Sequence, residues 1–313
     1  MEFETFTQSE DSPIHSVKPE DQTIRGLKSP TELDDNVLAL PKYLSPSSAS
    51  VFKQCARKWK HRYIDKLPDP PTEPALVGTF VHRVLELLLQ EAPEQRTPER
   101  AKKAAREMWP EIKDDENFLA LQLNQDQERS FRWQSWLAIE GLWHIEDPSS
   151  VTVEATEQDI RVAIGGVPFR GIVDRVDIEE DGLIVTDYKS GRAPSERFVT
   201  DKLNQVLLYA AALDTLTGLR PVRARLLYLN QRIIEVQVTS ENLSEVTSKL
   251  QQIWQELQKN YETREFKPST GPLCAWCPFI SKCPEGQDEV KQRHLAGRVR
   301  ADAPGLIAIN QAS

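Results

Sequence analysis

The sequence predicts one α/β domain with a mixed central sheet, flanking helices and a helical insertion. Three observations predict it. Apolar residues recur at spacings of three and four between about residues 44 and 145, which is typical of helices. The period changes to two between 151 and 189, which indicates strands. A helix at about 200–217, ended by Gly218, then separates two further strands from the first set.

The first helix is predicted to begin after Ser45, whose hydroxyl can cap it. Phe52, Cys55, Trp59 and Tyr63 then follow at spacings of three and four, so we expect one continuous helix that carries Cys55 on its apolar face. A proline-rich loop ends it. Further helices are expected at about 77–91, 98–109, 115–145 and 241–261.

Strands are predicted where β-branched residues are frequent and polar residues alternate with apolar ones. The pairs Gly165-Gly166 and Asp181-Gly182 have the composition of hairpin turns, so the strands that flank them should be antiparallel neighbours. The expected strands are 151–154, 158–164, 167–178, 183–189, 223–229 and 233–238.

The chain divides into three segments. Residues 1–40 are polar, punctuated by prolines and without periodicity, and we expect a disordered acidic tail there. Residues 41–284 form the folded domain, with the helical insertion at about 95–147. Residues 285–313 are expected to be a C-terminal tail.

Composition points to a cytoplasmic protein that does not enter a membrane. The longest apolar run, 206–213, is too short to span a bilayer, and the acidic N-terminus does not resemble a signal peptide. In the cytoplasm thiols stay reduced, so the four cysteines are not expected to form disulfides.

The net charge of −9 seems to disfavour a nucleic-acid partner, but residues 1–40 alone carry −6. A basic stripe lies within the first predicted helix, opposed only by Asp65, and we consider two interpretations of it. A solvated helix face is the simpler. The interleaved Phe52, Trp59 and Tyr63 favour binding of single-stranded nucleic acid instead, because bases stack on aromatic side chains. The stripe consists of Lys53, Arg57, Lys58, Lys60, Arg62 and Lys66.

The cysteines suggest a metal centre. Cys274, Cys277 and Cys283 are spaced C-x2-C-x5-C in a loop rich in proline, and Cys55 lies 219 residues upstream. Such short spacings let several sulfurs converge. Two metal centres fit the residues, a four-thiolate zinc site and a cubane iron–sulfur cluster. The long gap disfavours zinc, because compact zinc ribbons draw their ligands from neighbouring turns.

A second constellation suits hard divalent cations. Asp174 lies in G-I-V-D-R-V-D, and Asp187 and Lys189 lie in I-V-T-D-Y-K-S-G, on the far side of a short turn. In paired antiparallel strands these three side chains can converge on one sheet face. A structural ion-pair network is the alternative. Two carboxylates on an apolar sheet are nevertheless costly unless they bind something, and a lysine beside a cation can orient water or stabilise phosphoryl charge.

Three further polar side chains follow a helical spacing. His82 has Gly78 four residues before it and Glu86 four residues after it, and Gln205 and Tyr209 are also four apart. A lone helical histidine is more often packed or at the surface than a ligand, and the Gln–Tyr pair fits ordinary packing as well.

Taken together, these segments resemble a known family. G-T-F-V-H-R-V-L-E, G-I-V-D-R-V-D, D-Y-K-S-G, Q-V-L-L-Y and C-x2-C-x5-C occur in one order between about residues 44 and 284. This set resembles the RecB-like branch of the PD-(D/E)XK nuclease superfamily, and within it the iron–sulfur members akin to the CRISPR-associated adaptation exonuclease and the AddB nuclease domain. The resemblance implies a restriction-endonuclease-like core.

The resemblance also implies roles for the residues that match its motifs. His82, Asp174 and Asp187 would bind Mg²⁺ or Mn²⁺, helped by the carbonyl of Tyr188. Lys189 would be the catalytic lysine. An acidic residue often opens the strand before the aspartate, and Glu157 and Glu154 compete for that position. Gln205 and Tyr209 would position the lysine and the substrate, and a 4Fe–4S cluster would bind Cys55, Cys274, Cys277 and Cys283.

These residues predict a metal-dependent DNA exonuclease that acts on single strands or DNA ends, in DNA repair, recombination or CRISPR-type processing. The alternative is an idle nuclease-like scaffold subunit of a helicase–nuclease complex, although intact Asp174, Asp187 and Lys189 argue against it. The sequence has no Gly-x4-Gly-Lys-Ser/Thr phosphate loop, so any unwinding must come from a helicase partner. A CRISPR adaptation protein is another expected partner.

Overall fold

A computed structural model describes residues 39–69 and 71–311. From Leu40 onward they belong to one compact unit. The predicted acidic tail, residues 1–40, lies almost entirely outside the described residues. No described helix combines the length and apolarity that crossing a membrane requires.

A five-stranded mixed sheet forms the centre of the described unit, in the order β1-β2-β3-β4-β5. Every neighbouring pair is antiparallel except β3 and β4, which are parallel. Glycines with positive φ, Gly165 and Gly166, make the turn between the first two strands, as predicted. The sheet confirms the predicted mixed α/β class. Its strands are β1 (Val153–Ile164), β2 (Val167–Glu179), β3 (Gly182–Lys189), β4 (Arg223–Tyr228) and β5 (Arg232–Gln237).

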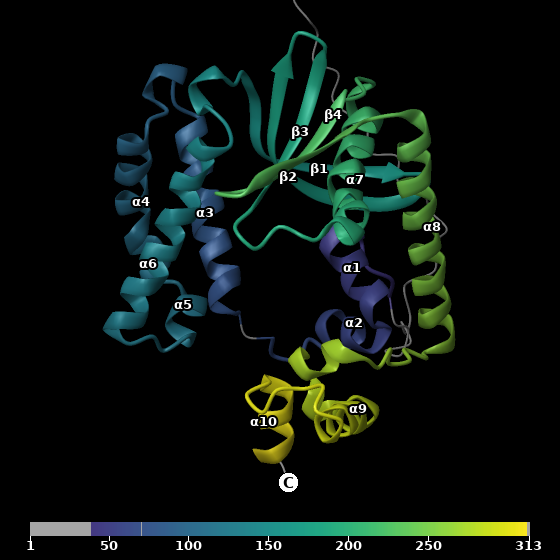
Figure 1. The fold of residues 1–313 in the computed structure, drawn as a ribbon. Helices are drawn as coiled ribbons and strands as arrows, with labels where there is room; N and C mark the ends of the chain where they lie inside the picture. Colours follow the sequence, from purple (N-terminus) through teal and green to yellow (C-terminus); the bar gives the residue numbers. More distant parts are fainter. Residues whose placement is uncertain (1–38, 70, 312–313) are drawn as a thin grey trace, which may run out of the picture. The chain divides into compact units, whose positions relative to one another are not determined.

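Helix α7 (Val199–Thr217) connects the two parallel strands and packs on one face of the sheet (Figure 1). The apolar run 206–213 lies inside it and is buried throughout. Gly218 ends the helix in the left-handed conformation, with φ of 71°, which glycine adopts without steric cost. Helix α8 (Ser240–Thr263) packs against α7.

The opposite face is covered by a helix at Glu73–Leu89 and by the helical insertion, which share one apolar core with Tyr188 of β3 and Leu227 of β4 (Figure 1). Phe80, Phe118 and Phe131 are aromatic members of this core. Because neighbouring residues of a strand point to opposite faces, Tyr188 contacts the insertion while Asp187 faces α7. The helices on this side are α3 (Glu73–Leu89), α4 (Pro98–Lys113), α5 (Glu116–Ala120) and α6 (Gln125–Glu140).

The predicted continuous helix at 115–145 is wrong. The chain turns at Gln122, whose φ is 51°, and Asn124 starts α6 with a capping box. Two reciprocal cap hydrogen bonds satisfy the free amides of a new helix, so they favour a break that apolar periodicity does not reveal.

The predicted single helix through Cys55 is also wrong. Cys55 is extended, with φ of −166° and ψ of 114°, and it separates α1 (Pro46–Gln54) from α2 (Ala56–Tyr63). Trp59 is fully buried and donates its indole N–H to Ser48 Oγ at 2.9 Å. Phe52 is buried as well. These two aromatic residues are therefore core residues, which contradicts their interpretation as a platform for bases.

The C-terminal residues, for which the sequence predicted only a tail, form two helices, α9 (Pro284–Leu295) and α10 (Pro304–Gln311). They pack with the cysteine loop in a small core that includes Ile280, Val290 and Leu306. The loop is therefore held between folded segments.

Candidate functional site

The strand register brings the two predicted aspartates together. Arg175 of β2 pairs with Thr186 of β3, so Asp174 and Asp187 come next on their strands, where the ladder ends. Asp174 Oδ2 accepts the backbone N–H of Tyr188 at 2.7 Å. Both carboxylates are buried, Asp174 at 8% exposure and Asp187 at 2%. The sheet thus holds two carboxylates side by side at one edge.

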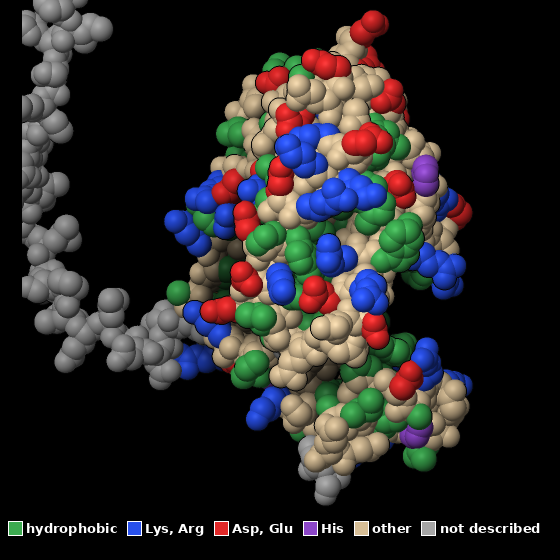
Figure 2. All heavy atoms as spheres, turned by 90° about the vertical axis from the view of Figure 1, so that its left-hand side faces the viewer, with side chains coloured by type: hydrophobic (Ala, Val, Ile, Leu, Met, Phe, Trp, Pro, Cys, Tyr) green, Lys and Arg blue, Asp and Glu red, His purple; other side chains and the backbone are tan. Residues whose placement is uncertain are grey.

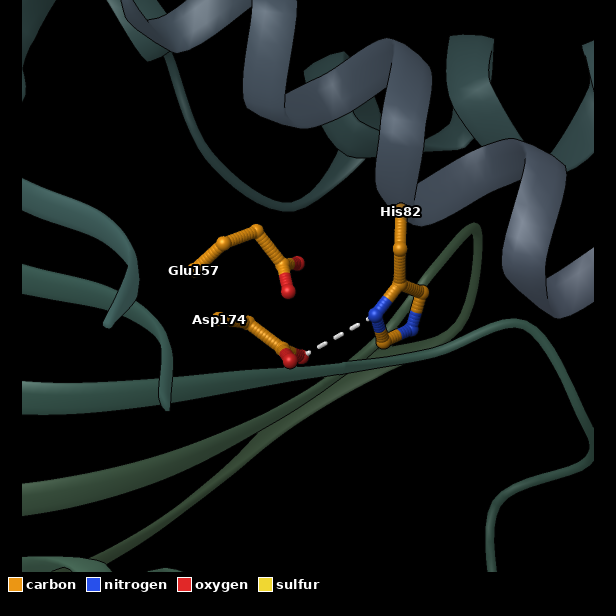
Figure 3. Close-up of side chains that lie close together, drawn as sticks. All are labelled: His82, Glu157 and Asp174. Carbon is orange, nitrogen blue, oxygen red and sulfur yellow. Dashed lines mark ion pairs between the residues drawn. The ribbon is translucent and has the colours of Figure 1, made fainter. Parts of the chain in front are cut away.

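His82 reaches the same edge from α3. Its Nδ1 lies 3.4 Å from Asp174 Oδ2 (Figure 3). Its Nε2 lies 3.1 Å from the carbonyl oxygen of Tyr188. Glu157 completes the group, because single ligand atoms of His82, Glu157 and Asp174 all lie within 4.8 Å of one another. Of the predicted metal ligands, the structure therefore places His82, Asp174 and the Tyr188 carbonyl together, with Asp187 on the strand next to Asp174.

Glu157 owes its position to a backbone irregularity in β1. Its φ is 47°, a conformation that non-glycine residues seldom adopt. Thr156 pairs with Arg175 and Gln158 with Val173, which leaves Glu157 opposite Asp174. Glu154, the rival for this role, is exposed and lies outside the group. The geometry therefore favours Glu157.

The crowding of acids shifts their proton affinities. Burial, and then the charge of Asp174, raise the pKa of Glu157 to about 7. Burial and Asp174 also raise the pKa of Asp187 to about 6, although Lys189 opposes the shift. Burial acts to lower the pKa of His82, but the hydrogen bond and charge of Asp174 outweigh it, and the net shift is upward. The group therefore carries excess negative charge that a cation would relieve.

Lys189, Gln205 and Tyr209 form a connected chain on the α7 side. The Lys189 ammonium contacts Asp187 Oδ2 and donates to Gln205 Oε1 at 3.2 Å. The Gln205 amide donates to Asp187 Oδ1 at 2.8 Å and to the Tyr209 hydroxyl at 3.1 Å. Gly171 makes room for this tyrosine, since a Cβ there would lie 2.6 Å from Tyr209 Cε1. The predicted residues at 187, 189, 205 and 209 are thus linked.

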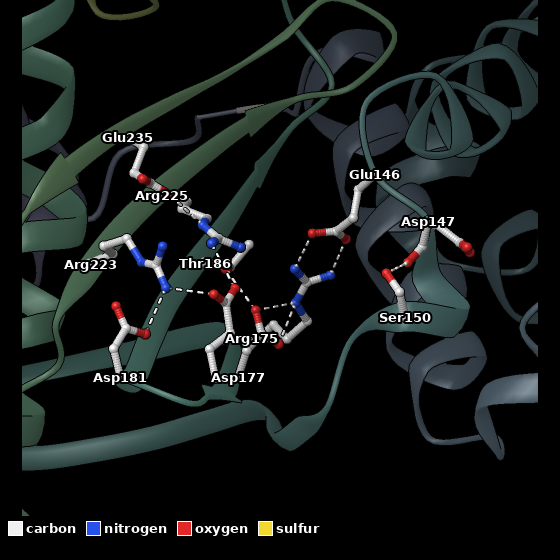
Figure 4. A network of polar contacts seen from close by, with 11 residues as sticks. Glu146, Asp147, Ser150, Arg175, Asp177, Asp181, Thr186, Arg223, Arg225 and Glu235 are labelled. Carbon is white, nitrogen blue, oxygen red and sulfur yellow. Dashed lines mark hydrogen bonds and ion pairs between the residues drawn. The ribbon is translucent and has the colours of Figure 1, made fainter.

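A polar network that the sequence reasoning missed lies on the other sheet face. Arg175 is fully buried and donates two hydrogen bonds of 2.7 Å to Glu146, at the end of the insertion (Figure 4). It also contacts Asp177 at 2.8 Å and donates to the Tyr188 hydroxyl at 3.0 Å. The signal was an arginine inside the apolar strand G-I-V-D-R-V-D. This network anchors the side chain of Tyr188, whose backbone contacts both His82 and Asp174.

The four cysteines line one cavity of about 240 Å³. Cys55 caps α2 and accepts backbone N–H groups of Lys58 at 3.5 Å and Ser269 at 3.4 Å. Cys283 is the N-cap residue of α9. Cys283 makes no side-chain cap hydrogen bond, and burial raises the pKa of its thiol as it raises that of Cys277. Cys274 is the fourth cysteine of the cavity.

The distances between the cysteine sulfurs indicate which kind of metal centre they could bind. One zinc ion with bonds of about 2.3 Å places its tetrahedral sulfurs about 3.8 Å apart. Among the described residues, the group of His82, Glu157 and Asp174 is the only one with three or more ligand atoms within 4.8 Å of one another. The cysteines are therefore spread more widely than a single zinc ion requires.

The predicted basic stripe consists mostly of paired cations. Lys53 lies 3.7 Å from Asp201, and Lys60 lies 2.6 Å from Asp65. Arg57 lies 3.6 Å from Glu285 and donates to the carbonyl of Phe266, while Arg62 contacts Asp69. The face of the helical insertion likewise mixes basic and acidic side chains (Figure 2). That this stripe contacts the phosphate backbone of a nucleic acid therefore stays a prediction.

Comparisons with known proteins bear on this arrangement. Residues 43–284, more than half of the chain, match the PD-(D/E)XK nuclease superfamily. None of the curated proteins matches the chain. Among solved structures, the chain is similar to a crystal structure named "Putative exonuclease" from Eubacterium rectale, at 16% identity and a TM-score of 0.49, covering 75% of this chain and 87% of that chain. The mixed sheet with flanking helices is the fold of the matched family. The chain belongs to the PD-(D/E)XK nuclease superfamily.

Proposed function

We propose that the protein is a divalent-metal-dependent DNA exonuclease of the RecB-like, iron–sulfur type. Family membership supports nuclease activity. The observation that carries the proposal is the convergence of His82, Glu157 and Asp174 within 4.8 Å, next to the pair Asp187–Lys189. An idle scaffold would have no need to keep these acids buried together with a lysine.

The donor set fits Mg²⁺ or Mn²⁺. Carboxylate and carbonyl oxygens with one imidazole make a mostly hard site. His82, Asp174, Asp187 and the Tyr188 carbonyl would hold the cation, and Glu157, which lies close to His82 and Asp174, would be a further ligand or a second acid beside it. A cation bound there would polarise the scissile phosphate and lower the pKa of a coordinated water.

Charge stabilisation and orientation of water would be carried out by Lys189, which Gln205 and Tyr209 hold in place. Lys189 is held by Asp187 and Gln205, so its ammonium is directed to the edge where a phosphate would meet the carboxylates. There it can stabilise the charge that develops on the phosphoryl oxygens and orient the attacking water. Gln205 keeps the lysine in place, and Tyr209 keeps Gln205 in place.

We propose a 4Fe–4S cluster for the cysteine cavity. The cavity and the spread of the four sulfurs support it over a single zinc ion. Its role is structural, since phosphodiester hydrolysis transfers no electrons. It would join α2 to the loop after α8, segments that are more than two hundred residues apart in sequence.

The substrate we propose is single-stranded DNA or a DNA end, in repair, recombination or CRISPR-type processing, with a helicase or CRISPR adaptation protein as partner. The basic stripe of α1 and α2 is the proposed path of the phosphate backbone. Arg57 and Lys58 also line the cysteine cavity, so Lys53 and Lys66 are the better residues for a binding test. Their replacement by Gln should weaken DNA binding and flatten its salt dependence.

The activity is tested with end-labelled single-stranded DNA, Mg²⁺ or Mn²⁺, and wild-type protein beside Asp187→Ala and Lys189→Ala. We expect the wild type to release short products, chelation to stop it, and each variant to bind DNA but not cleave it. Full cleavage by Asp187→Ala, in preparations free of contaminating nuclease, would reject the site. DNA binding without cleavage by the wild type would favour the scaffold alternative.

A further inference from the structure

The connection between β3 and α7, residues 190–198, has no role in the proposed reaction so far. It begins directly after Lys189 and runs to the start of α7 (Figure 1). A Cβ added at Gly78 would lie 3.4 Å from Ser190 Oγ, and Gly78 is about one helical turn before His82 on α3. The connection therefore starts beside the candidate site.

The other end of this connection meets the basic stripe. Lys53, the first residue of the stripe, lies 3.7 Å from Asp201 in the first turn of α7. Phe198, the last residue of the connection, immediately precedes that helix. A DNA strand that passes from the stripe to the acids of the site would therefore run along residues 190–198.

Two side chains at the turn between β4 and β5 hold the connection in place. Gln231 accepts one of its backbone N–H groups at 2.8 Å and donates to one of its carbonyls at 2.9 Å. Arg232 donates to the carbonyl of Pro194 at 2.8 Å and pairs with Glu196 at 2.7 Å. A ligand would thus meet a segment whose backbone is already fixed and whose one acid, Glu196, is already neutralised.

The groups that this segment presents to solvent suit a nucleotide. Arg192 and Arg197 are exposed, and within the described part of the chain neither forms an ion pair, unlike most cations of the stripe. The guanidinium of Arg197 lies over the ring of Phe198, 4.5 Å from its centroid, and Phe198 is 46% exposed. An unpaired arginine can bind a phosphate, and an exposed ring with a guanidinium can stack on a base.

We propose that residues 190–198 bind single-stranded DNA at the candidate site, with Arg192 on a phosphate and the pair Arg197–Phe198 stacked on an unpaired base. The inference rests on the proposed function, and it selects the single strand over the duplex end as substrate. A duplex keeps its bases stacked and paired, so it would gain the phosphate contact but not the stacking contact.

The test measures affinity by fluorescence anisotropy in EDTA, where cleavage is stopped, with the full-length protein. Three labelled DNAs of equal length are compared: a single strand, the same strand made of abasic sites, and a blunt duplex. The variants are Phe198→Ala and Arg192→Gln. Leu216→Ala and Arg220→Gln are matched controls, because Leu216 is 50% exposed and both residues lie at the far end of α7, a helix about 28 Å long.

We expect Phe198→Ala to weaken binding of the single strand by at least about fivefold, with a much smaller effect on the abasic strand and the duplex. Arg192→Gln should weaken binding of both single strands and reduce the log-log salt slope by about 0.7. The two controls should bind all three DNAs as the wild type does.

Three results would overturn the inference. They are wild-type affinity of Phe198→Ala for the single strand, an equal loss by Phe198→Ala on the abasic strand, and an unchanged salt slope for Arg192→Gln. Failure of the proposed function gives a different result. In that case the two variants lose affinity as expected, but the wild type does not cleave the single strand in Mg²⁺ or Mn²⁺.

Discussion

Two acidic residues of the candidate site carry a free-energy cost that the fold alone does not offset. Asp187 and Glu157 are buried beside Asp174, and their pKa values rise to about 6 and about 7. A carboxyl whose pKa is higher in the folded than in the unfolded state destabilises the fold once the pH exceeds its unfolded value. This free-energy penalty grows as the pH rises from the unfolded to the folded pKa, and above the folded pKa it stays constant.

We therefore predict that the thermal stabilisation by Mn²⁺ increases with pH. At about pH 5.5 most Glu157 carboxyls are protonated and compete with the cation, whereas at about pH 8 both acids are ionised and their repulsion is relieved by it. The shift in melting temperature caused by saturating Mn²⁺ should be larger at the higher pH. An equal shift at both pH values would contradict these proton affinities.

We predict that a side chain at position 171 slows cleavage because it displaces the ring of Tyr209. An alanine there would place its Cβ 2.6 Å from the tyrosine ring, so the ring must move and its hydrogen bond with Gln205 weakens. Gly171→Ala should reduce the single-turnover cleavage rate by roughly tenfold to a hundredfold at saturating DNA. If the effect runs through Tyr209, Gly171→Ala combined with Tyr209→Phe should cost less than the sum of the two changes. Additive losses would place the cause elsewhere.

At the scale of elements, the sequence predicted α7 and the later strands well, because a period of two and glycine turns specify a hairpin locally. It wrongly divided β1 into two strands, 151–154 and 158–164. It missed the breaks at Cys55 and Gln122, because each depends on a cap or on a single backbone conformation. The left-handed backbone conformation of Glu157 could not be predicted from the sequence either. Only the family resemblance predicted His82 as a ligand, because it is the packing of α3 on the sheet that brings His82 to Asp174.

The link between the insertion and β2 gives a prediction at this scale. Removing Arg175 leaves Glu146 and Asp177 buried without their counter-charge. Arg175→Met should lower the free energy of unfolding in urea by about 3–5 kcal/mol. Arg170→Met on the same strand is the matched control, because Arg170 pairs with Asp159 at the surface and should unfold close to the wild-type midpoint. Equal behaviour of the two variants would mean that the buried network contributes little.

At the scale of the molecule, the cysteine cavity joins the N-terminal helices to the C-terminal ones. The sequence predicted Cys55, Cys274, Cys277 and Cys283 as the ligands of one metal centre, and all four line this cavity. The sequence could not show that α9 and α10 pack on this loop, since their apolar residues become a core only against the folded loop.

We predict that Cys55→Ser loses iron and its absorption near about 400 nm, and that it melts at a lower temperature, because one ligand of the closing metal centre is gone. Iron per chain and the melting temperature are measured on the same preparation. Full iron content with an unchanged melting temperature would mean that Cys55 is not a ligand of the centre proposed for the other three cysteines.

We propose that the acids gathered at the edge of the sheet drive DNA cleavage. The most direct test compares Glu157→Gln with Glu154→Gln, two acids of one strand of which only Glu157 lies with His82 and Asp174. The measurement is the single-turnover cleavage rate of labelled single-stranded DNA at saturating Mg²⁺. We predict a loss of at least about a hundredfold for Glu157→Gln and a wild-type rate for Glu154→Gln. Equal rates for the two variants would mean that Glu157 has no special part in cleavage.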